Sequence, residues 1–140
     1  MAAGLQYVPG VCNIGTAEIQ RRRQSGWIGL AVTIVAWGAF IAFRVPAPWR
    51  LFLFLPAAGS ATGFFQAGFH FCAGFGIRGV FNFGSEVGKT DTVEQAEFRR
   101  KDRTKARLIG LYSALVGIVV AAAAFLVPVS LSAAPTTKGL

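Results

Sequence analysis

Three long apolar segments constrain this 140-residue chain more than any other feature of its sequence. They cover residues 26–43, 51–73 and 108–127, and no Asp, Glu, Lys or Arg interrupts any of them. A hydrocarbon layer about 30 Å thick is crossed by roughly 20 helical residues, so each segment can span it with modest tilt. The sequence therefore predicts an all-α integral membrane protein with three transmembrane helices.

Positive charge is distributed unevenly around these segments. Eleven of the fourteen Lys and Arg residues precede the first segment or separate the second from the third, and only Arg44, Arg50 and Lys138 fall on the other side. Cytoplasmic loops carry the excess of Lys and Arg. We therefore expect the N-terminus and residues 74–107 in the cytoplasm, and the 44–50 turn and the C-terminus outside. The first 25 residues contain no apolar core of signal-peptide length, so no cleavable signal is expected.

Glycine, proline and charge divide the chain into five expected parts. Residues 1–16 form a cytoplasmic lead-in in which Thr16 caps the first helix. Residues 17–73 form a transmembrane helical hairpin with spans at 26–43 and 51–73. A cytoplasmic loop rich in Gly and Phe over residues 74–91, a basic helix continuing into the third span over residues 92–127, and an external tail over residues 128–140 complete the chain.

Charge spacing supports the helix expected over residues 92–127. Glu97/Lys101 and Asp102/Lys105 are spaced to pair along one helix face. At 1.5 Å per residue this helix is about 54 Å long, so its first half projects into the cytoplasm. Cations beside a span attract anionic lipid headgroups, which accounts for the net charge of +8 without nucleic acid. The expected lipid-binding or partner-binding residues are Arg21, Arg22, Arg23, Arg99, Arg100, Lys101, Arg103, Lys105 and Arg107.

Small residues recur at every fourth position in the second and third segments. This spacing lets two helix backbones approach closely, which drives helix association in lipid. We therefore expect close packing of spans two and three, or packing against another membrane subunit. The residues expected at these contacts are Gly59, Gly63, Ala67, Gly110, Ala114 and Gly117.

His70 is the only histidine and lies near the cytoplasmic end of the second segment. An ionisable side chain at membrane depth is a functional candidate. One interpretation is a ligand to haem or to a chlorophyll-type pigment, and the other is a structural histidine bonded to a backbone carbonyl. Cys12 and Cys72 fall on the same side, where a reducing compartment disfavours a disulfide. Without a nearby carboxylate these three side chains predict no metal site.

Patterns associated with catalysis are incomplete in this chain. The match to G-x-G-x-x-G at residues 74–79 follows an apolar span instead of a β-strand, and the phosphate-loop-like stretch at 84–90 is one residue short. The three spans contain no acid, which disfavours a proton-coupled transporter. Thr62 and Gln66 are expected to form hydrogen bonds between helices. We therefore predict that the chain is not an enzyme.

The residues from Cys12 to Arg21, Cys-Asn-Ile-Gly-Thr-Ala-Glu-Ile-Gln-Arg, precede the first apolar segment. This stretch resembles the N-terminal signature of small bacterial inner-membrane proteins of the YgaP-like transmembrane-domain group. The resemblance covers residues 12–43 and implies a bacterial-type hairpin with a cytoplasmic cap. It carries no catalytic residue across.

A chain that offers much contact surface and has no set of residues arranged for catalysis is best explained as one part of a larger protein complex. We expect a non-catalytic accessory subunit of a larger complex in a bacterial cytoplasmic membrane, of respiratory or photosynthetic type. Its expected partners are other integral membrane subunits and anionic lipids. Two alternatives stay open, namely a haem- or pigment-binding subunit that uses His70 and a small oligomeric transporter or channel.

Overall fold

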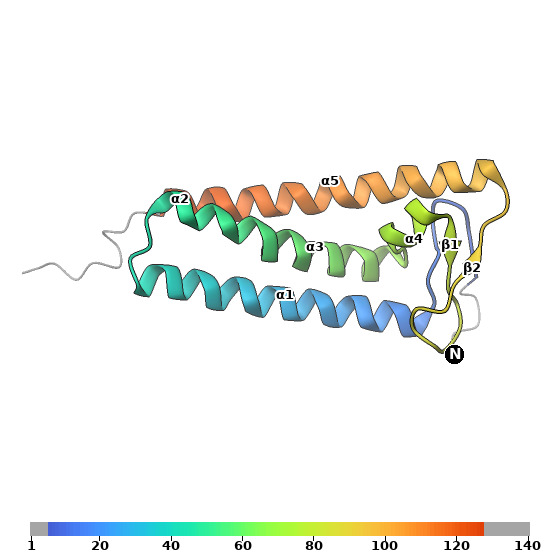
Figure 1. The fold of residues 1–140 in the computed structure, drawn as a ribbon, viewed down its shortest axis with the longest axis horizontal. Helices are drawn as coiled ribbons and strands as arrows, with labels where there is room; N and C mark the ends of the chain where they lie inside the picture. The colour runs from blue at the N-terminus through green and yellow to red at the C-terminus, as the bar shows by residue number, and fades with distance from the viewer. Residues whose placement is uncertain (1–5, 128–140) are drawn as a thin grey trace, which may run out of the picture.

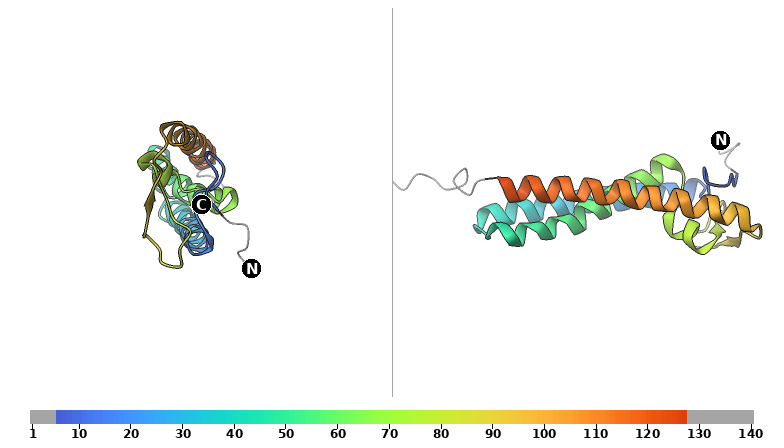
Figure 2. Two further views of the ribbon diagram at one scale, coloured as in Figure 1. Left: turned by 90° about the vertical axis from the view of Figure 1, so that its right-hand side faces the viewer. Right: turned by 90° about the horizontal axis from the view of Figure 1, so that it is seen from above.

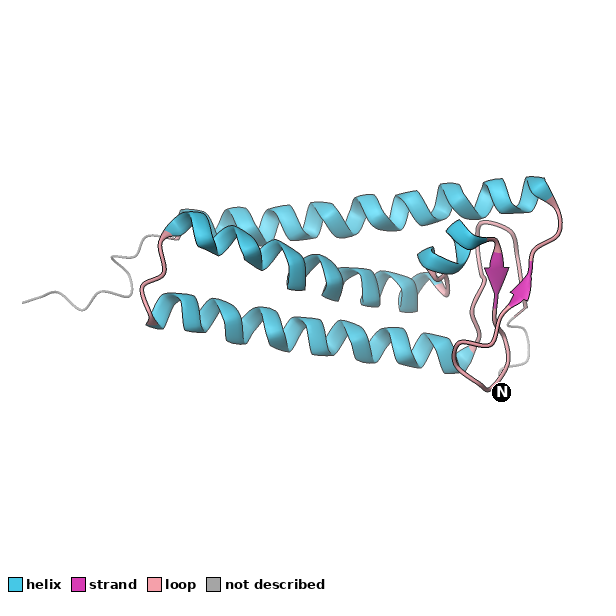
Figure 3. Cartoon of the chain, in the orientation of Figure 1, coloured by secondary structure: helices cyan, strands magenta, loops and turns pink. Residues whose placement is uncertain are grey.

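The computed structural model describes residues 6–127, and most of them are helical (Figures 1 and 3). Local sequence accounts for the main helix ends, since Pro46 and Pro48 stop any continuation of the first helix into the second. The elements are α1 (Thr16–Ala42), α2 (Ala47–Arg50), the 3-10 turn η1 (Leu51–Leu53), α3 (Phe54–Phe69), α4 (Ala73–Arg78), β1 (Val80–Phe81), β2 (Asp91–Thr92) and α5 (Ala96–Leu126).

Helix α3 lies between α1 and α5 and packs against both, whereas the two outer helices do not pack closely against each other (Figures 1 and 2). The three helical stretches Thr16–Ala42, Ala47–Phe69 and Ala96–Leu126 are long and apolar enough to cross a membrane. This confirms the number and composition of the predicted spans. The described chain begins and ends at opposite ends of this elongated bundle.

At the end of the bundle where the chain begins, the polypeptide folds into a compact structure that we call the cap, comprising residues 6–20 and 70–95. Here the expectation of an all-helical chain with a loop over residues 74–91 is wrong in part. Residues 73–78 form α4, which ends at Gly79 with φ +72°, and β1 then pairs with β2 in an antiparallel register. The Val93 amide extends this pairing by donating to the Gly79 carbonyl at 2.7 Å.

Three predicted helix boundaries shift because of tertiary contacts. Helix α1 begins at Thr16 itself, after Gly15, and no side chain caps it. Helix α3 ends at Phe69, because His70 adopts a left-handed conformation with φ +55°. Helix α5 begins at Ala96 instead of residue 92, because residues 91–92 are taken up by the β pairing. The tail expected over residues 128–140 lies outside the described residues.

The closest helix contact joins α1 and α3. A Cβ on Gly63 would lie 2.6 Å from the Gly26 nitrogen, and a Cβ on Gly29 would lie 2.9 Å from the Ser60 backbone. The Ser60 hydroxyl donates to the Gly26 carbonyl at 2.7 Å across the same contact. Gly63 therefore packs tightly, but its partner is the first span, whereas the sequence pattern favoured the third.

The remaining residues of the predicted small-residue stripes divide into two groups. Gly117 of α5 makes room for the ring of Phe54, and Ala67 is buried. Ala114 is half-buried. Gly59 and Gly110, by contrast, face open space: beyond the adjoining residues and backbone of their own helix, no atom lies within 4 Å of the position that a Cβ would occupy.

Candidate functional site

Asn13 lies at the centre of the cap and is completely buried. Its side-chain amide donates to the Cys72 carbonyl at 3.0 Å, and its side-chain oxygen accepts from the Cys72 amide at 2.6 Å. Its backbone amide donates to the His70 carbonyl at 3.1 Å, and its own carbonyl accepts from the Asn82 amide at 3.0 Å. Asn13 therefore joins the N-terminal segment to the α3–α4 junction and to the residue after β1.

Glu18 is the second fully buried polar residue of the cap. Its Oε1 accepts from the Asn82 side-chain amide at 3.0 Å and from the Gly88 amide at 2.7 Å. Its Oε2 lies 3.4 Å from Nη2 of Arg22, one helical turn further along α1. Such charge-assisted bonds offset the cost of burying a carboxylate. Glu18 therefore holds the loop between β1 and β2 against the start of α1.

Arg22 points into the protein, although the sequence grouped it with the lipid-facing arginines. Its Nη2 donates to the Cys72 sulfur at 3.1 Å, and its guanidinium lies 5.7 Å from the centre of the Phe75 ring. Arg99 likewise turns inward and donates to the Val93 carbonyl at 3.3 Å. These two arginines therefore stabilise the cap.

Asp102 of α5 is the second buried carboxylate, and the predicted Asp102/Lys105 pair is wrong. Asp102 accepts from the Tyr7 hydroxyl at 2.6 Å and from the Gly10 amide at 2.7 Å. Burial, reinforced by the hydrogen bond and the negative charge of Asp102, raises the pKa of Tyr7 well above its usual value. The Lys105 ammonium instead lies 4.2 Å above the Phe69 ring. The predicted pair of Glu97 and Lys101 is present at 3.8 Å.

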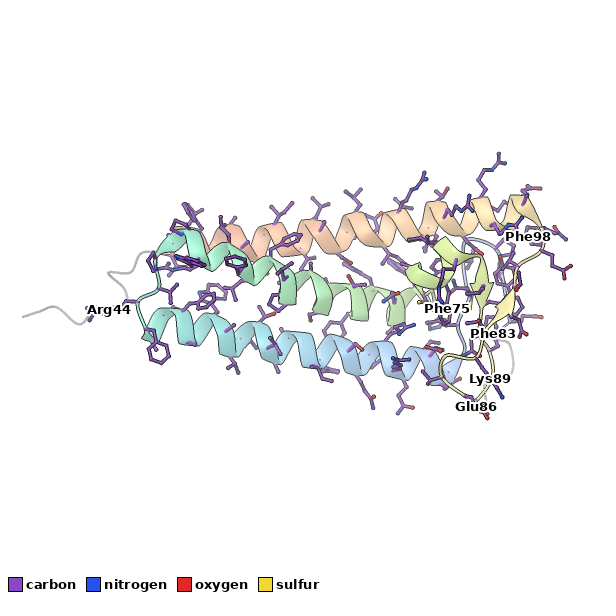
Figure 4. All side chains as sticks on the ribbon, in the orientation of Figure 1. Arg44, Phe75, Phe83, Glu86, Lys89 and Phe98 are labelled. Carbon is purple, nitrogen blue, oxygen red and sulfur yellow. The ribbon has the colours of Figure 1, made fainter. Side chains whose placement is uncertain are left out.

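The cations predicted to face lipid or a partner thus separate into two inward residues and seven others. Lys105 is half-buried, and the remaining six are exposed. All of them belong to the start of α1 or the first half of α5, next to the cap. Figure 4 shows Glu86 and Lys89 at the cap end of the bundle and Arg44 at the opposite end. The exposed six are Arg21, Arg23, Arg100, Lys101, Arg103 and Arg107.

His70 contributes its backbone, not its side chain, to the interior of the cap. The side chain is exposed, and the left-handed backbone turns its carbonyl toward the Asn13 amide. Among residues 6–127, no three side chains of His, Cys, Asp or Glu come together as metal ligands. Haem or pigment ligation by His70 stays a prediction.

The two cysteines and the polar residues of the second span also have structural surroundings. Cys12 and Cys72 are both buried free thiols, and burial raises the pKa of Cys12. Thr62 bonds within its own helix to the Ala58 carbonyl, and the Gln66 side chain accepts from the Ala73 amide. The expectation of a bond between helices is therefore wrong for Thr62, whereas the Gln66 bond joins α3 to the first residue of α4.

A cavity of about 430 Å³ lies beside the first turn of α1. Its walls carry no titratable side chain, so they offer no side-chain acid or base to activate the hydroxyls of Thr16 and Ser85. The residues that line it are Gly15, Thr16, Ala17, Gln20, Phe83, Gly84 and Ser85.

Arg50 forms a separate polar site at the other end of the bundle and is almost fully buried. Its Nη1 donates to the Ala124 carbonyl at 3.0 Å and to the Val127 carbonyl at 2.7 Å, and its Nε donates to the Val45 carbonyl at 3.2 Å. The last carbonyls of a helix lack intrahelical partners and carry partial negative charge. Arg50 therefore caps the C-terminal end of α5, a role that the sequence pattern did not reveal.

Comparison of this chain with protein-family models, with curated proteins and with solved structures finds no match.

Proposed function

We propose that this protein is a non-catalytic accessory subunit that packs against another integral membrane protein. The observation that carries the proposal is the open position of Gly59, which lies inside α3, is exposed, and has free space where a Cβ would stand. Glycine inside a helix costs about 1 kcal/mol relative to alanine. Contact with a lipid chain does not offset this cost. Contact with a second helix does, because glycine lets the two helix backbones approach closely.

The polar groups of the cap support the same proposal. The carboxylates of Glu18 and Asp102 and the amide of Asn13 are all engaged in hydrogen bonds that join distant segments. These groups are therefore committed to holding the cap together and are not directed at a substrate. Structure of this kind suits a subunit that presents surfaces to a partner.

In the proposed orientation the cap faces the cytoplasm and the Arg44–Arg50 turn faces outside, since the excess of Lys and Arg lies at the cap end. We further propose a bacterial cytoplasmic membrane and a host complex of respiratory or photosynthetic type. Both follow from the small size of the chain and the resemblance of its N-terminal stretch.

Orientation is tested with introduced cysteines, because both native thiols are buried and react poorly. Ser85→Cys lies on the exposed cap loop, and Arg44→Cys lies at the exposed turn on the opposite end. A membrane-impermeant maleimide applied to intact cells should label Arg44→Cys and miss Ser85→Cys. The reverse result would exclude the proposed orientation.

The subunit proposal is tested by purification from the native membrane in mild detergent. The wild-type chain should migrate on a native gel with a larger membrane protein, and Gly59→Leu should release it. The melting temperature of purified Gly59→Leu in detergent should match the wild type, because Gly59 is exposed and its Cβ position faces open space in this chain. A wild-type chain that migrates alone, with no change in Gly59→Leu, would overturn the proposal.

A further inference from the structure

The two acidic residues of α5 are either buried or far from the apolar part of the helix. The exposed charges of α5 next to its apolar part are therefore all positive. Asp102 is fully buried, and Glu97 lies five residues further from the membrane than Asp102. Between Asp102 and the apolar part of α5, the exposed charges are Arg103 and Arg107. They stand four residues apart and therefore on one face of the helix.

Helix geometry places this pair of arginines at headgroup depth. The apolar segment of α5 begins at Leu108, so Arg107 and Arg103 lie about 1.5 and 7.5 Å beyond the hydrocarbon edge at 1.5 Å rise per residue. The polar layer of each leaflet is about 5–8 Å thick. Arg100 and Lys101 lie about 10–12 Å beyond the same edge by this rise, outside that layer.

The surface directly below the pair is apolar and exposed. Leu111 follows Arg107 by one helical turn on the same face and is 53% exposed, and Leu115 follows by another turn and is 50% exposed. Tyr112, about 6 Å inside the hydrocarbon edge at 1.5 Å rise per residue, is also exposed. A ligand that suits this face therefore combines a negative group with a long apolar chain.

We propose that Arg103 and Arg107 form a binding site for an anionic phospholipid, whose phosphate they hold while an acyl chain lies along Leu111 and Leu115. Guanidinium groups bind phosphate oxygens in a bidentate geometry, and a second negative charge in the headgroup strengthens the attraction. The site rests on the membrane insertion proposed above. It does not depend on the presence of a partner subunit.

The test measures which lipid contacts a tryptophan placed just below the site. The reporter protein carries Leu111→Trp together with Trp27→Phe, Trp37→Phe and Trp49→Phe, and is reconstituted in phosphatidylcholine vesicles. Brominated phosphatidylglycerol and brominated phosphatidylcholine quench the tryptophan only when they touch it. We expect the quenching to give a preference for phosphatidylglycerol of roughly fivefold or more, the effect of about one interfacial cation.

The matched variants remove two charges each from the same helix. Arg103→Gln with Arg107→Gln should reduce the preference to near one. Arg100→Gln with Lys101→Gln should leave it unchanged, because these residues lie beyond the headgroups. Equal loss in both double variants would overturn the site in favour of a diffuse surface charge. Loss of the preference in inorganic phosphate at millimolar concentration would instead overturn the lipid as ligand, in favour of free phosphate at the same arginines.

Two further outcomes separate this inference from the proposals before it. A reporter protein that fails to float with vesicles would overturn both the membrane insertion and the lipid site. A protein that floats but shows no preference for phosphatidylglycerol would overturn the lipid site alone. If Arg103→Gln with Arg107→Gln then also releases the partner subunit, this face binds an acidic protein surface instead.

Discussion

Replacing Gly63 with alanine tests the contact between α1 and α3 with a single methyl group. The new Cβ would lie 2.6 Å from the Gly26 nitrogen and 2.7 Å from the Arg22 carbonyl oxygen, whereas ordinary contact begins at 3.4 Å. Both neighbours are backbone atoms and cannot rotate away. The two helices must therefore separate locally by about 0.8 Å, which also stretches the 2.7 Å hydrogen bond from Ser60 to Gly26.

The expected cost combines two unfavourable effects and one favourable effect. Overpacking a tight interior contact costs typically about 1–3 kcal/mol. A weakened interhelical hydrogen bond in a membrane protein adds about 0.6 kcal/mol. Alanine in place of glycine returns up to about 1 kcal/mol through helix propensity. We therefore expect Gly63→Ala to lower the free energy of unfolding by about 1–2 kcal/mol.

Gly59→Ala provides the matched control on the same helix, one turn away. Its methyl group would stand in open space beside its own helix, so only the gain in helix propensity remains. The variant should therefore be as stable as the wild type or up to about 1 kcal/mol more stable. Reversible unfolding of the purified chain in mixed micelles, followed by far-ultraviolet circular dichroism, measures both variants. Equal stabilities of Gly63→Ala and Gly59→Ala would refute the α1–α3 contact.

Two further predictions concern the polar sites at the two ends. Arg50→Met should destabilise the chain by about 2 kcal/mol and speed amide exchange in the last turn of α5, because the carbonyls there lose a charged donor. Arg44→Met, in the connection between the first two long helices, should change stability little. Tyr7 keeps its proton to higher pH in the folded chain than its ordinary pKa of 10.0 allows in the unfolded chain. Its contribution is therefore complete below pH 10 and declines as pH rises above 10. Between pH 9 and pH 11 the melting temperature should fall further for the wild type than for Tyr7→Phe. An equal fall in both proteins would exclude the bond from Tyr7 to Asp102.

The three helices and the charge asymmetry were predictable because both depend on local composition. A segment such as 108–127 is long and apolar wherever it packs. The Arg and Lys residues that come directly before it in the sequence stay beside its first turn in any arrangement of the helices. The Glu97/Lys101 pair was predictable for the same reason, since its two residues are one helical turn apart. Periodicity likewise identified Gly63 and Gly117 as packing residues, although it could not say which helix each would meet.

The sequence alone thus determined how many helices are long and apolar enough to cross a membrane and where the cations gather. The tertiary structure decided what nearly every polar residue does. Asn13 meets a residue 59 positions away, Glu18 one 64 positions away, and Tyr7 one 95 positions away. Contacts of this range leave no periodic signal in a single sequence, because the side chain that satisfies a buried amide or carboxylate is chosen by how the segments cross. The same reason explains why Arg22 turned inward while Arg21 and Arg23 stayed exposed. Adjacent residues on a helix point about 100° apart, and only the position of the cap decides which of them it covers.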